Sequence, residues 1–225
     1  MNYTINTVDD LLSYHSDIKS LKFGYDFNQS VDLSSLVNLT SLTFDYSFDK
    51  PIDLSNLVNL VELEFGYCYN QLTDLSTLSN LTYLEFGTNY NKKINLSNQS
   101  NLQTLIFKNN YNQLIDLSKL TNLSKLHFGY YFNQPIDLSK LTNLSKLYFG
   151  YCFDQPLYLS NLTNLKELKF GNNFQQHIDV SNLSDLCNLE FPQKYNKYID
   201  LSMLKKLQYL KIPKYCKEKQ SCCLM

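Results

Sequence analysis

Two glutamates offer the strongest candidate for acid–base chemistry. Glu64 and Glu85 lie 21 residues apart, and on adjacent parallel strands their backbones would be about 5 Å apart. Two carboxylates that close raise the pKa of one member, as general acid–base catalysis requires. The alternative is a solvated acidic patch. The sequence indicates no cleft and no positioned nucleophile, so we predict no enzyme and assign no catalytic residue.

The cysteines and histidines give no metal or redox motif. No Cys-x-x-Cys pair is present to begin a zinc site. Cys68 and Cys152 occupy one position four repeats apart, about 19 Å, which is too far for a disulfide. His15, His127 and His177 fall at three different positions of the repeat. We therefore expect no metal and no cofactor, and a reduced, cytoplasmic chain.

The last residues suggest a lipid anchor. The chain ends CCLM, which fits the C-a-a-X motif and places a farnesyl group on Cys222. A single lipid binds membranes weakly; a palmitoyl group on Cys216 or nearby lysines would add affinity for an anionic cytoplasmic membrane face. These lysines are Lys214, Lys217 and Lys219. The alternative is a terminal cysteine without function. The first residues do not resemble a signal peptide, and no apolar run is long enough to span a membrane.

A strict repeat must position all these side chains. The triplet Asp32-Leu33-Ser34 recurs in similar form every 21 residues through Asp200-Leu201-Ser202, nine copies without insertion or deletion. Each copy has too few apolar positions for a core of its own, whereas stacked coils can share one. Alternating residues, as in Leu42-Thr43-Phe44, predict one short strand per coil. We predict an α/β-type, leucine-rich-repeat-like solenoid of about ten coils, each with a short parallel strand plus turns or short helical or 3-10 segments, in a single right-handed superhelix.

The position after each strand is restricted. All six glycines of the chain occupy it, and Pro192 and Pro213 also do. Since proline cannot adopt positive φ, we interpret the position as one that needs little side-chain bulk. A column of tyrosines follows it, at Tyr25, Tyr46, Tyr67, Tyr130 and Tyr151. Columns of Asn and Ser are interpreted as turn formers that satisfy backbone groups.

The outward strand positions vary from coil to coil, and such variation on a rigid scaffold favours recognition. Along the chain these positions are first acidic, then aromatic or apolar, and they include a stretch that is rich in lysine. The predicted partner-binding residues are Glu62, Glu64, Tyr83, Glu85, Ile106, Lys125, His127, Lys146, Tyr148 and Lys169. We expect a protein partner of unknown identity and a monomeric chain. Because the lysines alternate with glutamates and the net charge is −1, nucleic acid is not expected. The alternative is that this face is only exposed to solvent and binds no partner.

The repeat resembles the FNIP repeat, a relative of the leucine-rich repeat. Its namesake segment stands as Phe132-Asn133-Gln134-Pro135 and Phe153-Asp154-Gln155-Pro156. The resemblance implies an interaction scaffold; some members carry an F-box that recruits ubiquitin ligase, but 17 residues before the first repeat are too few for one. The alternative is a ligase-type substrate adaptor that recruits its machinery through the N-terminal cap or through another chain. We divide the chain into an N-terminal cap at 1–17, with a short helix near 7–12, a solenoid at 18–212 and a tail at 213–225.

Overall fold

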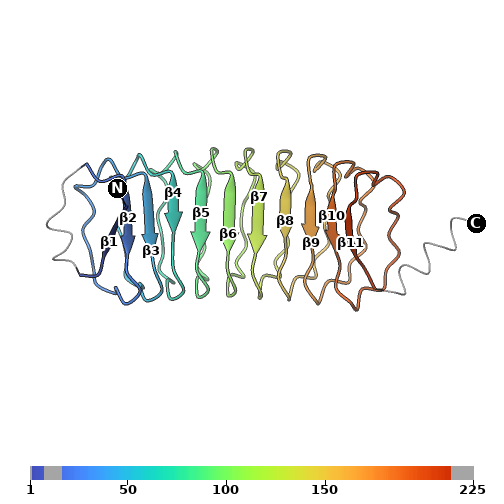
Figure 1. The fold of residues 1–225 in the computed structure, drawn as a ribbon, viewed down its shortest axis with the longest axis horizontal. Coiled ribbons are helices and arrows are strands. Elements are labelled where there is room, and N and C mark those ends of the chain that lie inside the picture. Colours follow the sequence, from blue (N-terminus) through green and yellow to red (C-terminus); the bar gives the residue numbers. More distant parts are fainter. Residues whose placement is uncertain (1, 8–16, 214–225) are drawn as a thin grey trace, which may run out of the picture.

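The protein is an elongated solenoid with one parallel sheet along its length (Figure 1). A computed structural model describes residues 2–7 and 17–213. Within these residues eleven strands follow one another in chain order, each beside its sequence neighbour. The strands are β1 (Asn2–Ile5), β2 (Ser20–Phe23), β3 (Ser41–Phe44), β4 (Glu62–Glu64), β5 (Tyr83–Phe86), β6 (Thr104–Phe107), β7 (Lys125–Phe128), β8 (Lys146–Tyr148), β9 (Glu167–Lys169), β10 (Asn188–Glu190) and β11 (Tyr209–Lys211).

The strand register confirms the repeat. From β2 onward each strand residue pairs with the residue 21 positions later, as in Leu105 with Leu126. The first strand was not predicted: Asn2 pairs with Ser20, an offset of 18, and Ile5 is fully buried beside Phe23. The predicted cap therefore includes a strand. Most of its expected helix, together with Cys216 and Cys222, lies outside the described residues.

Turns connect the strands, and no helix occurs in 2–7 or 17–213. The Asp32 carboxylate accepts a 2.9 Å hydrogen bond from the Ser34 backbone N–H. This bond lowers the pKa of Asp32, so its contribution to stability is lost as the pH falls. The same bond recurs at Asp53, Asp74, Asp116, Asp137, Asp179 and Asp200. Between coils, the Asn59 amide donates to the Val37 carbonyl at 2.9 Å. The polar columns are therefore turn formers, as predicted.

The core is a set of columns, each built from one position of the repeat. Leu33 and Phe48, which represent two of these columns, are 1% and 0% exposed. Two columns consist of aromatic rings, and Phe128 stacks on Phe132 within its own coil at 3.7 Å between ring centroids. The same ring lies 5.9 Å from Phe107 in the preceding coil. Each coil therefore covers the apolar side of the next, which a single coil could not do.

One ring column contains a buried polar group that can be tested. Phe132 continues the column of Tyr69, Tyr90 and Tyr111. The Tyr69 hydroxyl lies 2.9 Å from the Thr73 hydroxyl, whereas the buried Tyr111 hydroxyl has no hydrogen-bond partner among the described residues. Burial accordingly raises the pKa of Tyr111.

We expect Tyr111→Phe to increase the free energy of unfolding by about 1 kcal/mol, because it removes an unpaired buried hydroxyl. The matched variant Tyr69→Phe should decrease it by about 1 kcal/mol, because it removes a paired one. Urea unfolding followed by circular dichroism measures both. A loss of stability in Tyr111→Phe comparable to that in Tyr69→Phe would contradict the assignment.

Candidate functional site

The outward face of strands β4 to β9 carries all ten predicted partner-binding residues. Side chains alternate along each strand, so the buried Leu63 and Leu84 point inward and their neighbours point outward. Parallel pairing without slippage brings Glu62 beside Tyr83 and Glu64 beside Glu85. The strands therefore place the predicted residues in two continuous rows. Whether these rows bind a partner remains a prediction.

At the acid end the two glutamates have different environments. Glu85 is 7% exposed. Its carboxylate accepts a short hydrogen bond from the Tyr83 hydroxyl and forms an ion pair with the Lys108 ammonium at 2.6 Å. Glu64 is half-buried, and its pKa is raised by burial and then by the charge of Glu85. Burial is therefore the larger cause of the shift at Glu64, and the neighbouring carboxylate adds to it. Glu85 is, however, covered by its partners and offers little contact surface.

The raised pKa of Glu64 predicts a pH-dependent stability. Because the folded chain holds the Glu64 proton more tightly than the unfolded chain, whose glutamate pKa is about 4.3, ionisation of Glu64 lowers stability as the pH rises above that value. We expect Glu64→Gln to raise Tm at pH 7 by about 1–3 °C and to change it little at pH 3.

A second glutamate provides the opposite control. The pKa of Glu167 is lowered by hydrogen bonds from Lys146 and Tyr148, so its ionised form stabilises the fold above its ordinary pKa. Glu167→Gln should therefore lower Tm at pH 7. Differential scanning calorimetry at the two pH values measures both effects. Equal shifts of the same sign at pH 7 would refute this account of Glu64.

The centre of the face is more enclosed than its sequence suggested. Ile106 lies on the outward row beside Glu85 and His127, yet it is only 7% exposed. His127 contacts the Tyr148 ring edge-on at 5.8 Å, and burial lowers the pKa of His127. Ile106 was predicted as an exposed contact, which is wrong because neighbouring side chains close over it.

Two of the three lysines in the predicted basic stretch of Lys125, Lys146 and Lys169 form ion pairs with glutamates. The Lys146 ammonium lies 2.7 Å from Glu167, and that of Lys169 lies 2.8 Å from Glu190. Lys169 also lies 5.6 Å from the centre of the Tyr148 ring. Glutamates one repeat later therefore compensate these lysines, so the surface alternates in charge. The glutamates and the lysines occupy the same outward rows of the repeat, one coil apart. This spacing was the sequence signal that could have identified the ion pairs.

A column of exposed tyrosines forms an aromatic surface next to the strands. Tyr46 stacks on Tyr25 and on Tyr67 with ring centroids 4.7 Å apart in both pairs. Tyr130 and Tyr151 form a second stack at 4.8 Å. All five rings are at least 37% exposed. The sequence indicated this column, whereas its division into two face-to-face stacks follows from the structure.

The described residues contain no group of three or more His, Cys, Asp and Glu able to hold a metal ion. Cys68, Cys152 and Cys187 are free thiols. A cavity of about 400 Å³ lies near the ends of β8 to β11, and neither Glu64 nor Glu85 lines it. No helix in the described ranges is long and apolar enough to cross a bilayer.

These features define a leucine-rich-repeat-like solenoid. No protein-family model matches the chain, and no curated protein sequence does. The functional domain of InlJ from Listeria monocytogenes has a similar structure, with a TM-score of 0.68 and 23% identity over 89% of this chain. The internalin InlF from the same species gives 0.55 and 23% over 88%. TLR13, in a complex with ssRNA13, gives 0.59 and 17% over 93%.

The chain spans 43% of the InlJ chain, 68% of InlF and 38% of TLR13. At these identities the similarity shows a shared fold. The residues on the outward face must therefore be interpreted from their own chemistry.

Proposed function

We propose that this chain is a non-catalytic scaffold that binds a protein through the outward face of β4 to β9. The observation that carries the proposal is the contrast between the columns. The core positions repeat Leu or Phe in nearly every coil, whereas the outward positions carry Glu, Tyr, Thr, Ile, His and Lys in changing order. A core that repeats and a surface that varies fit a scaffold whose surface specifies the partner.

The rigidity of the face supports this role. Ion pairs and the His127–Tyr148 contact hold many outward side chains in place. A partner that binds there loses little additional side-chain entropy on the solenoid side. Charges of both signs are available to contribute specificity more than affinity. The resemblance of the repeat to the FNIP repeat favours the same class of function.

Charge reversal tests the proposed face. The double variant Glu62→Lys/Lys125→Glu keeps the net charge and changes two accessible outward positions. We expect affinity purification with this variant to lose the partners recovered with the wild-type chain. The control is Lys119→Glu/Lys140→Glu, which changes exposed positions in the turns and should retain the partners. Recovery of the same partners by both variants would refute the proposed face, and recovery of ubiquitin-ligase subunits would favour the adaptor alternative.

We also propose that Cys222 carries a prenyl group that tethers the scaffold to a cytoplasmic membrane face. The proposal is supported by the terminal Cys-Cys-Leu-Met sequence and the lysines that precede it. A palmitoyl group on Cys216 is the second anchor that a single prenyl chain requires. Intact-mass measurement of the chain from eukaryotic cells tests this, with Cys222→Ser as the control. An unmodified chain that retains Met225 would overturn it.

A further inference from the structure

The second tyrosine stack ends abruptly at Tyr151. Its ring lies 4.8 Å from that of Tyr130, with 8° between the ring planes. One face of Tyr151 is therefore covered, and the opposite face points along the stack toward the next coil. The next two positions of the column are Asn172 and Gln193, which have no ring. Tyr151 remains 38% exposed.

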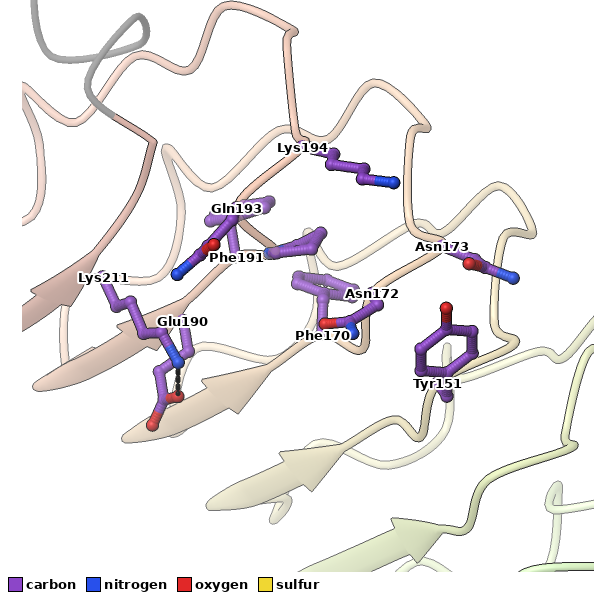
Figure 2. Close-up of a pocket in the computed structure, with 10 residues that line it drawn as sticks. Tyr151, Phe170, Asn172, Asn173, Glu190, Phe191, Gln193, Lys194 and Lys211 are labelled. Atoms are coloured by element: carbon purple, nitrogen blue, oxygen red, sulfur yellow. Dashed lines mark ion pairs between the residues drawn. The ribbon is translucent and has the colours of Figure 1, made fainter.

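A hollow occupies the place of the missing rings. The cavity of about 400 Å³ is lined by Tyr151, Asn172 and Gln193, and Figure 2 shows these residues at successive places along its length. The amide of Asn173 and the ammonium of Lys194 also line it. Its volume falls in the range of ligand-binding pockets. The cavity thus combines one available ring face with amides that donate and accept hydrogen bonds.

The charged side chains around this hollow are not evenly distributed. Lys211 and Glu190 line one side and approach each other to 3.7 Å (Figure 2), while Glu190 also pairs with Lys169. Lys194 also lines the hollow and is drawn apart from Glu190 and Lys211 (Figure 2). A ligand that brings a single negative charge toward Lys194 and keeps it away from Glu190 would therefore be favoured.

We propose that this hollow binds an aromatic side chain of an extended partner segment, with an acidic residue beside the aromatic one. The aromatic ring continues the stack on Tyr151 at the spacing of the column, and such offset stacking is favourable. The amides of Asn172, Asn173 and Gln193 bind peptide N–H and C=O groups, and Lys194 binds the carboxylate. A nucleotide would also stack and bring its phosphate to Lys194, but the chain has no arginine to form bidentate phosphate contacts. The inference rests on the proposed protein-binding function and adds the chemistry of one contact.

The absence of tryptophan from the chain makes a direct test possible. The probe is the blocked peptide acetyl-Asp-Trp-Gly-amide, whose tryptophan is excited selectively and titrated with the full chain. We expect saturable binding in the millimolar range or tighter. Tyr151→Phe keeps the ring and should bind equally well. Tyr151→Ser should weaken binding roughly tenfold, because it removes the stacking surface.

A variant that fills the hollow provides the sharper test. Asn172→Tyr restores the consensus residue of the column, so its ring should stack on Tyr151 and exclude the tryptophan. We expect it to abolish binding, whereas Tyr46→Ser, in the other stack, should leave binding unchanged. Circular dichroism verifies that each variant is folded. If Asn172→Tyr does not fold, the comparison of Tyr151→Phe with Tyr151→Ser decides.

Three results would overturn the inference: no saturable change in the tryptophan fluorescence at chain concentrations on the order of 1 mM, equal binding by Tyr151→Ser, or tighter binding of adenosine monophosphate than of the peptide. The last would assign the hollow to a nucleotide. These outcomes are separate from the charge-reversal experiment on β4 to β9. Loss of partners there, together with no peptide binding here, would leave the proposed function intact and remove only this contact.

Discussion

Replacement of Phe128 by alanine is expected to lower the free energy of unfolding by about 3–5 kcal/mol. Phe128 is fully buried and lies in the middle of the ring columns. Its ring contacts Phe132 at 3.7 Å and lies 5.9 and 6.0 Å from Phe107 and Phe149. The hydrogen-bonded register of β6, β7 and β8 holds the coils on both sides at a fixed spacing. The cavity therefore cannot close by moving one coil toward the next.

An exposed aromatic residue is the control for this variant. Tyr158 is 85% exposed, and Tyr158→Ala should change stability by less than about 0.5 kcal/mol. Urea unfolding followed by circular dichroism gives both values. A loss below about 1.5 kcal/mol in Phe128→Ala would show that the stack can relax around the missing ring, contrary to a core of rigidly spaced coils.

Gly87→Ala is expected to cost about 2–4 kcal/mol, because the added methyl group meets backbone. A Cβ at Gly87 would lie 1.7 Å from the Gly66 carbonyl oxygen and 2.9 Å from that of Phe65. No described residue has positive φ, so the reason is close approach between coils and not a left-handed conformation. This supports the interpretation that little side-chain bulk fits at Gly87, whereas the same position holds Asp45 and Lys108 in two other coils. The two coils must separate to accept the methyl group, which weakens the contacts on both sides.

The equivalent glycine of the first repeat provides the matched control. A Cβ at Gly24 would meet the side chain of Asn6, with the Asn6 Oδ1 atom 2.1 Å away, and the nearest backbone atom is at 3.4 Å. Because the obstacle at Gly24 is the end of a side chain and not backbone, Gly24→Ala should cost at least about 1 kcal/mol less than Gly87→Ala. Thermal and urea unfolding of both variants test the difference. Equal destabilisation would contradict this account, because of these two glycines only Gly87 is approached closely by the backbone of the preceding coil.

Much of this architecture can be predicted from the sequence because the repeat contains no insertion or deletion. In such a repeat, each strand residue lies beside the equivalent residue 21 positions away. The spacing in the sequence therefore determines which distant residues are in contact. The burial of Leu33 and Phe48, the pairing of Leu105 with Leu126 and the polar turns therefore follow from the chain alone. The outward rows could be assigned for the same reason, because alternation along a strand determines which side chains leave the core.

The tertiary structure decided the features that depend on contacts other than those between equivalent positions. The strand at residues 2–5 joins the sheet through an offset of 18, which the period does not predict. Glu85 is covered because Tyr83 and Lys108 reach it from different positions of the repeat. The hollow beside Tyr151 lies where Asn172 and Gln193 stand in place of the rings that the two preceding coils carry at Tyr130 and Tyr151. Periodicity specifies which positions are stacked, but side-chain length and rotamer determine which of the surrounding residues touch, and these contacts exist only when the coils are assembled.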